Sequence, residues 1–191
     1  MVFSEGDIVR KDRRLFRKFD GLKYGWLKDA EKFLLLLVIV FLVFRFVIGC
    51  SFVKGESMLP TLKNGELVLY VRFCPKYKAG DVVSVRIPSE EYYVKRIIAA
   101  AGDTIDIRDG SVYVNGEQIE EDYIQGRTEQ QQGAVKYPMT LKEGQIFIMG
   151  DNREESADSR TFGVVGERQI KGKLVLQMGR QKGKYYIRKV E

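Results

Sequence analysis

The sequence predicts a mainly β protein, an antiparallel sheet or barrel-like body that follows a single N-terminal transmembrane helix. Residues 33–53 read FLLLLVIVFLVFRFVIGCSFV, an apolar run with one charge, long enough to span a bilayer as a helix. After residue 53, short runs rich in Val, Ile, Leu and Tyr alternate with Gly- and Asn-containing turn signals. No helical segments separate these runs, which favours an antiparallel β architecture.

Residues 1–32 are a basic segment that we expect on the cytoplasmic side. Nine Lys and Arg residues lie within residues 10–32, and the positive-inside rule places such a flank in the cytoplasm. The chain after residue 53 is then expected outside the membrane. Because most of the net charge of +6 lies beside the apolar run, the lipid bilayer is the expected partner, and we expect no nucleic acid.

The apolar run at residues 33–53 has alternative interpretations. A cleaved secretory signal would require a small-residue cleavage site and a shorter basic region. Residues 47–50 (VIGC) resemble a lipoprotein processing box, but Arg45 lies just ahead of them, separated by one residue. A buried helix of a soluble protein is rarely apolar on every face over such a length. We therefore favour an uncleaved anchor.

Residues 54–191 are expected to form one extracytoplasmic domain. The pair Asp109-Gly110 predicts a tight hairpin. The polar segment 117–140 is expected to be a surface excursion. Strands are predicted over residues 66–73, 81–87, 92–101, 104–107, 112–114, 145–149, 173–177 and 185–190.

The candidate chemistry centres on Ser57, in the stretch GESMLP just after the apolar run. A serine needs a base to become a nucleophile, and the chain contains no histidine. Lys95 is the candidate base, because a strand places it on one face with Tyr93 and Ile97, where desolvation lowers the pKa of a lysine. Two cysteines without histidine argue against a zinc site, and we expect no metal and no cofactor.

Three stretches follow one another along the chain: GESMLP at 55–60, YVKR at 93–96 with Gly102-Asp103 after it, and GDNREESADSR at 150–160. Together, and in this order, they closely resemble the signature boxes of the bacterial type I signal peptidases. The single anchor before the serine matches as well. The resemblance implies a serine–lysine dyad endopeptidase of the signal peptidase fold, with Ser57 as nucleophile and Lys95 as general base. It also implies that Ser156 hydrogen-bonds and orients the lysine. The further supporting residues it implies are Asp151, Asn152, Arg153, Asp158 and Arg160.

Two residues before the nucleophile, Gram-negative members of this family have a serine whose hydroxyl contributes to the oxyanion hole. This chain has Gly55 at that position, as many Gram-positive members do. The oxyanion hole is therefore expected to use backbone N–H groups at Gly55 and Ser57. The resemblance implies cleavage of signal peptides from secreted preproteins through an acyl-enzyme, with small side chains preferred before the bond. The residues expected to line these subsites are Val53, Met58, Tyr93 and Val94. Expected partners are signal peptides, the bilayer and, transiently, the translocation machinery.

Two other functions fit parts of the pattern. A repressor-type self-cleaving peptidase has the same dyad, but the apolar anchor and the lack of an N-terminal DNA-binding domain argue against it. An inactive membrane-tethered module would not require Ser57, Lys95 and Ser156. The pattern Ser51-x-x-Lys54 matches penicillin-binding enzymes only in isolation, because the S-D-N and K-T-G companion motifs are missing.

Overall fold

The computed structural model describes residues 26–74, 76–87, 92–132 and 135–190. Most of the basic segment 1–32 lies outside these residues. The chain divides into two compact units, residues 1–45 and residues 46–191.

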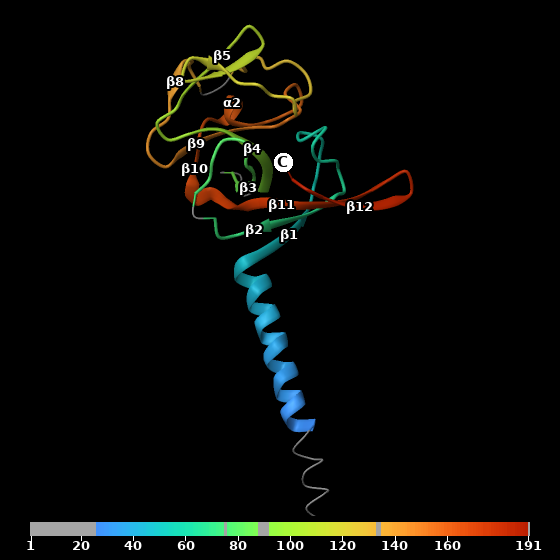
Figure 1. Cartoon of the computed structure of the whole chain (residues 1–191). Helices are drawn as coiled ribbons and strands as arrows, with labels where there is room; N and C mark the ends of the chain where they lie inside the picture. The colour runs from blue at the N-terminus through green and yellow to red at the C-terminus, as the bar shows by residue number, and fades with distance from the viewer. Residues whose placement is uncertain (1–25, 75, 88–91, 133–134, 191) are drawn as a thin grey trace, which may run out of the picture. The chain divides into compact units, whose positions relative to one another are not determined.

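In the first unit, residues 26–42 are α-helical and continue into a π-helical turn, η1 (Val43–Val47) (Figure 1). The large apolar side chains of this helix are exposed, Phe33 and Phe41 by more than 60%. Among the residues that the structure describes, no helix combines the length and the hydropathy required to cross a bilayer.

The helix ends before residue 48, so the predicted extent of a helix over 33–53 was wrong at its C-terminal end. Ile48–Phe52 form strand β1, which pairs antiparallel with β2 (Leu67–Val71). Gly49 permits this pairing, because an added Cβ would overlap the Tyr70 ring of β2. Pairing with a neighbouring strand therefore overrides the helical tendency of the apolar run.

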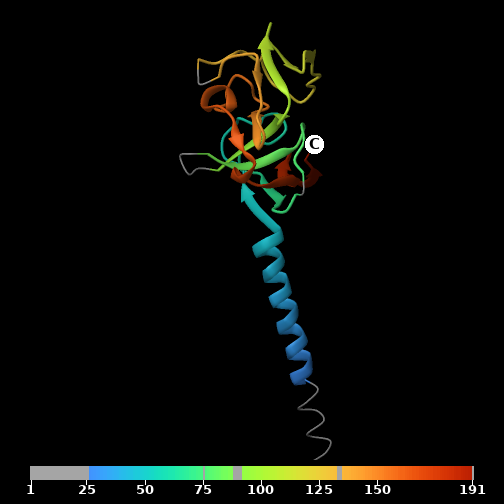
Figure 2. The same ribbon diagram turned by 90° about the vertical axis from the view of Figure 1, so that its left-hand side faces the viewer.

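The second unit contains two antiparallel sheets, which lie at opposite ends of this unit (Figures 1 and 2). The larger sheet has the order β1-β2-β11-β3-β4-β9-β10, with β12 paired to β11, and the smaller has the order β7-β6-β5-β8. The mainly β, antiparallel prediction is thereby confirmed. The remaining strands are β3 (Val82–Arg86), β4 (Tyr92–Ala100), β5 (Thr104–Arg108), β6 (Ser111–Val114), β7 (Glu117–Gln118), β8 (Met139–Thr140), β9 (Gln145–Met149), β10 (Val165–Gly166), β11 (Ile170–Gln181) and β12 (Lys184–Lys189).

Turn chemistry explains the smaller sheet. Asp109 and Gly110 adopt positive φ angles of 54° and 80°, as a two-residue hairpin turn requires, and join β5 to β6 as predicted. Asn115 and Gly116 join β6 to β7 in the same way. Two short helical pieces lie between strands, α2 (Ser159–Phe162) and η2 (Glu167–Gln169).

Three apolar clusters form the core of the second unit. One joins the smaller sheet to β9 through residues such as Ile105, Phe147 and Met149. A second packs Met58 and Leu62 against β2 and β11, and a third lies among β3, β4 and β9. The second cluster fixes the turn that carries Ser57.

Candidate active site

Ser57 lies in a turn between β1 and β2, and two residues on its C-terminal side, Met58 and Leu62, are buried. Met58 is 2% exposed and Leu62 is fully buried, and Leu62 N–H donates to the Met58 carbonyl at 2.8 Å. At the base of the turn, Val53 N–H donates to the Glu66 carbonyl at 2.8 Å. The turn is therefore anchored in the core while Ser57 itself stays partly exposed.

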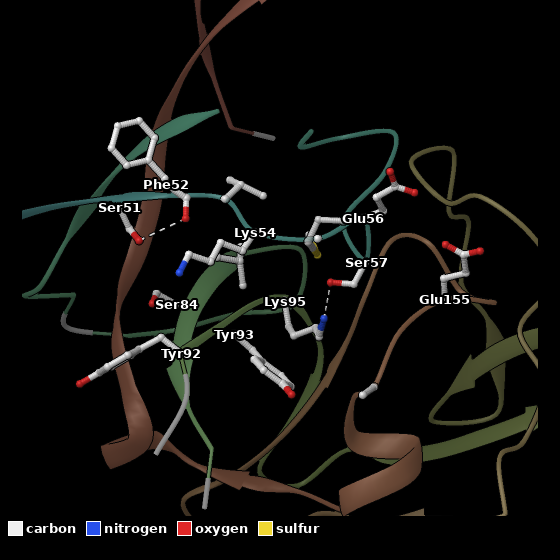
Figure 3. Close-up of a pocket in the computed structure, with 15 residues that line it drawn as sticks. Ser51, Phe52, Lys54, Glu56, Ser57, Ser84, Tyr92, Tyr93, Lys95 and Glu155 are labelled. Carbon is white, nitrogen blue, oxygen red and sulfur yellow. Dashed lines mark hydrogen bonds between the residues drawn. The ribbon is translucent and has the colours of Figure 1, made fainter. Parts of the chain in front are cut away.

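Lys95 reaches Ser57 from strand β4. Its Nζ donates to Ser57 Oγ at 2.6 Å (Figure 3). Lys95 pairs with Val83 of β3, and only 3% of its surface is exposed. Its Nζ lies 5.3 Å from the centre of the Tyr93 ring. A strand neighbour two residues away thus covers the amine, as the alternation of the sequence predicts.

Burial lowers the pKa of Lys95 from 10.5 to about 8. The carboxylates of Asp158 and Asp151 oppose this shift, and the Arg160 guanidinium adds to it. At pH 7, one unit below this pKa, about one lysine in ten is neutral. Such a lysine can accept a proton from a serine near neutral pH.

The loop at residues 150–160 packs against the backbone of the Ser57 turn. Asn152 donates from its backbone N–H to the Ser57 carbonyl at 3.1 Å and from Nδ2 to the Glu56 carbonyl at 3.2 Å. Gly150 is necessary for this approach, because an added Cβ would overlap the Ser57 carbonyl oxygen and the Ser156 side chain. The loop and the turn that carries Ser57 therefore hold each other in place.

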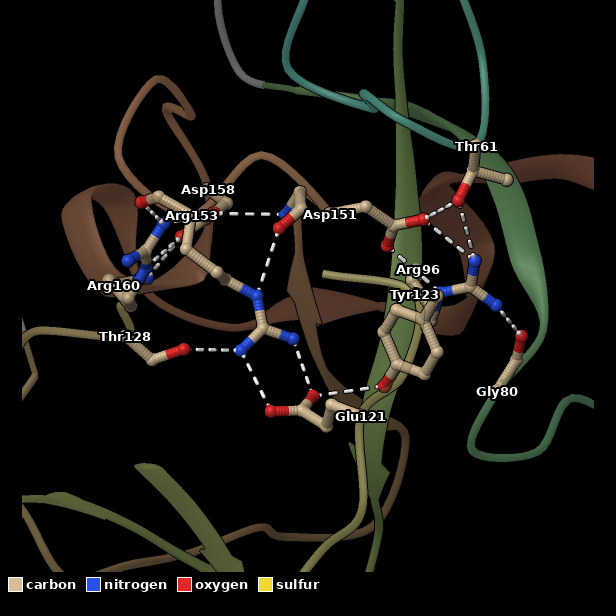
Figure 4. Close-up of polar contacts among 11 residues, drawn as sticks. Thr61, Gly80, Arg96, Glu121, Tyr123, Thr128, Asp151, Arg153, Asp158 and Arg160 are labelled. Atoms are coloured by element: carbon tan, nitrogen blue, oxygen red, sulfur yellow. Dashed lines mark hydrogen bonds and ion pairs between the residues drawn. The ribbon is translucent and has the colours of Figure 1, made fainter. Parts of the chain in front are cut away.

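Buried ion pairs hold the loop itself (Figure 4). Asp158 accepts two hydrogen bonds from the Arg160 guanidinium, both at 2.9 Å, and one from Gly150 N–H at 3.0 Å. Asp151 accepts two from Arg96, at 2.9 and 2.7 Å. Each of these four charged side chains is at most 2% exposed, so each charge has its partner within the fold.

The described part of the structure lacks the predicted hydrogen bond from Ser156 to Lys95, and it gives the Gly55 N–H another partner than an oxyanion. Ser156 is buried, but its Oγ has no hydrogen-bond partner among the described residues, so the expected bond to Lys95 is not formed. The Gly55 N–H donates to Asn64 Oδ1 at 3.1 Å, so it is not available to an oxyanion. Gly55 adopts a φ of +83°, and its N–H is directed to Asn64. Within the described chain, the Ser57 N–H donates none of the backbone hydrogen bonds of the turn.

A pocket of about 620 Å³ opens beside Ser57 and Lys95, which both line it. The four residues expected to line the substrate subsites, Val53, Met58, Tyr93 and Val94, all line it. Further lining residues that the sequence analysis did not identify are Phe52, Ser84, Tyr92 and Glu155. Figure 3 shows the side chains of Ser57 and Lys95 meeting between β4 and the turn that carries Ser57.

The polar segment 117–140 contributes buried contacts, so its prediction as a surface excursion was wrong in part. Glu121 forms a salt bridge with Arg153 at 2.5 Å, in which the two side chains are 5% and 0% exposed. Thr128 is fully buried and accepts from Arg153 Nη1 at 2.6 Å. A polar composition alone gave no signal that this segment packs beneath the loop at 150–160.

Several known proteins are similar to this chain. The model of the family described as "Signal peptidase, peptidase S26" matches residues 26–178. Signal peptidase I of Bacillus licheniformis is 34% identical over 160 residues, which cover 78% of this chain and 84% of that protein. Signal peptidase IB of Staphylococcus aureus is 35% identical over 154 residues, 72% of this chain and 81% of that protein. A crystal structure of a signal peptidase I from Enterococcus faecalis aligns with a TM-score of 0.42 and 30% identity over 52% of this chain and 97% of that one.

Proposed function

Because this chain belongs to the peptidase S26 family of signal peptidases, we propose that it is a membrane-anchored serine endopeptidase that removes signal peptides from exported preproteins. Ser57 is the nucleophile and Lys95 the general base. The observation that carries this proposal is the 2.6 Å contact between Lys95 Nζ and Ser57 Oγ, together with the lowered pKa of the lysine.

The reaction follows from this geometry. Neutral Lys95 takes the Ser57 proton as Oγ attacks the scissile carbonyl carbon, and the resulting ammonium then protonates the leaving amine. The signal peptide remains as an ester on Ser57 until a water, deprotonated by the same lysine, hydrolyses it. The Ser57 N–H is the proposed donor to the oxyanion. Asp151, Asn152, Arg153, Asp158 and Arg160 hold the loop that positions the nucleophile.

The pocket supports a preference for small side chains before the bond. Its walls at Val53, Met58 and Val94 are apolar, and Tyr93 covers Lys95 from the same side. Small apolar residues fit against such walls without displacing Met58, which is packed in the core. Ser156 is buried and lies close to Gly150. Its hydroxyl is proposed to form a hydrogen bond with the Lys95 amine during the reaction.

We propose that the apolar run at residues 33–53 anchors the protein in the cell membrane, with the domain after residue 53 on the outer side. The exposed apolar side chains of residues 33–42 support this, because water disfavours so large an apolar surface. Signal peptides, the bilayer and the translocation machinery are the proposed partners. The anchor would place the dyad where a translocated preprotein emerges.

Hydrolysis of a peptide with an Ala-X-Ala site tests the proposed activity. We expect the purified full chain in detergent to cut after the second alanine, and the same peptide with phenylalanine at that position to resist cleavage. Equal cleavage of both peptides, or cleavage of neither, would contradict the proposed specificity. Ser57→Ala serves as the control for contaminating proteases.

A further inference from the structure

Six charged side chains are buried as three ion pairs in and around the loop at 150–160 (Figure 4). The pairs are Arg96–Asp151, Arg160–Asp158 and Arg153–Glu121. Three cations balance three anions, so the cluster carries no net charge. Five members come from the stretches 93–96 and 150–160, and Glu121 comes from outside them.

Glu121 connects two of the three pairs. Both of its carboxylate oxygens accept from Arg153, at 2.9 and 2.5 Å. Tyr123 donates its hydroxyl to Glu121 Oε1 at 2.9 Å, and its ring lies 3.9 Å from the Arg96 guanidinium carbon. Burial raises the pKa of Tyr123, so the phenol keeps the proton it donates.

The contact between Glu121 and Arg153 extends to the nucleophile through the loop. Arg153 Nε donates to the Gly150 carbonyl at 3.0 Å, and the Arg153 carbonyl accepts from Arg160 at 2.7 Å. The preceding residue in the loop, Asn152, donates its backbone N–H to the Ser57 carbonyl. Glu121 therefore holds the side chain of Arg153, which in turn contacts Gly150 and Arg160 of the loop.

We propose that Glu121 is a positioning residue of the dyad: by neutralising the buried Arg153 it keeps the charge cluster balanced beside Lys95 and holds the loop that clamps Ser57. The proposal rests on the dyad function proposed above. Lys95 is the group expected to respond, since three other members of the cluster already act on its pKa: Asp158 and Asp151 raise it and Arg160 lowers it. The other groups that face Lys95 or line its pocket are Ser57, Tyr93, Lys54, Glu56 and Glu155.

Loss of the Glu121 charge has a predictable sign. Without it the cluster carries one net positive charge, which disfavours the ammonium form of Lys95 and lowers its pKa further. The rate rises with pH as Lys95 loses its proton, so the acid limb of the profile should move to lower pH. A buried arginine without a partner also destabilises the fold more than removal of both partners does.

The test compares Glu121→Gln with Glu120→Gln, which removes an exposed carboxylate one residue away. The measurement is kcat/KM for the Ala-X-Ala peptide from pH 6 to pH 10, on the full chain in detergent. We expect the acid limb of Glu121→Gln to shift down by about half a pH unit or more, with a lower plateau rate. Glu120→Gln should follow the wild-type profile.

The double variant Glu121→Gln/Arg153→Gln separates charge from packing. Its cluster is neutral again, so its acid limb should return to the wild-type position although its plateau stays low. Its thermal midpoint should exceed that of Glu121→Gln alone. A wild-type profile for Glu121→Gln would overturn the proposal. If Glu121→Gln does not fold, failure of the double variant to restore folding would overturn it as well. Absence of any cleavage by the wild type would instead refute the proposed function.

Discussion

Gly150→Ala should slow catalysis without removing any catalytic group. A Cβ on Gly150 would lie 2.7 Å from Ser156 Cβ and closer still to the Ser57 carbonyl oxygen. Real Cβ atoms almost never come within 3.0 Å of another heavy atom. The loop or the turn of Ser57 must therefore move, so that the contact with Ser156 Cβ lengthens from 2.7 Å to at least 3.0 Å. Relieving the shorter contact with the Ser57 carbonyl oxygen requires a larger movement.

This displacement moves the backbone of Ser57 and therefore its Oγ, the proposed nucleophile. A 1 Å misplacement costs about 100-fold in rate, so a shift of roughly half that size should lower kcat about tenfold. The overlap should also destabilise the domain by about 1–3 kcal/mol, as overpacking does. Both effects arise at one contact, between the loop at 150–160 and the turn of Ser57.

Steady-state hydrolysis of the Ala-X-Ala peptide measures this effect, with Gly166→Ala as the matched control. Gly166 has a φ of −87°, and a Cβ there would meet its nearest atom at an ordinary 3.6 Å. The control should retain the wild-type kcat. A Gly150→Ala enzyme within twofold of the wild type would refute the argument that this close approach positions Ser57.

Three further predictions follow from the same structure. The wild-type kcat/KM should rise with pH through a pKa near 8, because only neutral Lys95 accepts the Ser57 proton; a flat profile from pH 6 to pH 10 would exclude the lysine as base. Asp151→Asn should destabilise the domain by about 3 kcal/mol in a denaturant titration, since Arg96 loses a buried charged partner, whereas the exposed Asp122→Asn should have no effect. Protease added outside intact cells should digest residues after 53 and spare the first 30, and protection of the C-terminal domain would contradict the proposed orientation.

Several elements were predictable because the local chemistry decides them. Asp109-Gly110 specifies its hairpin through the positive φ angles that these residues tolerate. The β-branched runs of β3, β4 and β9 agree with their strands within about one residue. Lys95 could be proposed as a base because alternation along one strand predicts its apolar neighbours.

Other elements depend on contacts between segments distant in sequence. The apolar run gave no sign that residues 48–52 would pair with β2, since that pairing depends on how Tyr70 packs over Gly49. Glu121 was missed because its partner, Arg153, is 32 residues away. The hydrogen bond from the Gly55 N–H to Asn64 Oδ1 likewise appears only in the folded turn. Composition and motif spacing carry no information on such contacts.

Cleavage of a purified preprotein by the wild type, Ser57→Ala and Lys95→Arg tests the central claim most directly. The wild type should release the signal peptide. Ser57→Ala lacks the nucleophile, and Lys95→Arg keeps the positive charge but cannot give up its proton, so both should be inactive from pH 6 to pH 10 while folding normally. If either variant retained more than about a tenth of the wild-type rate, the Ser57–Lys95 dyad would not be the catalytic machinery, because loss of a member of such a unit costs orders of magnitude.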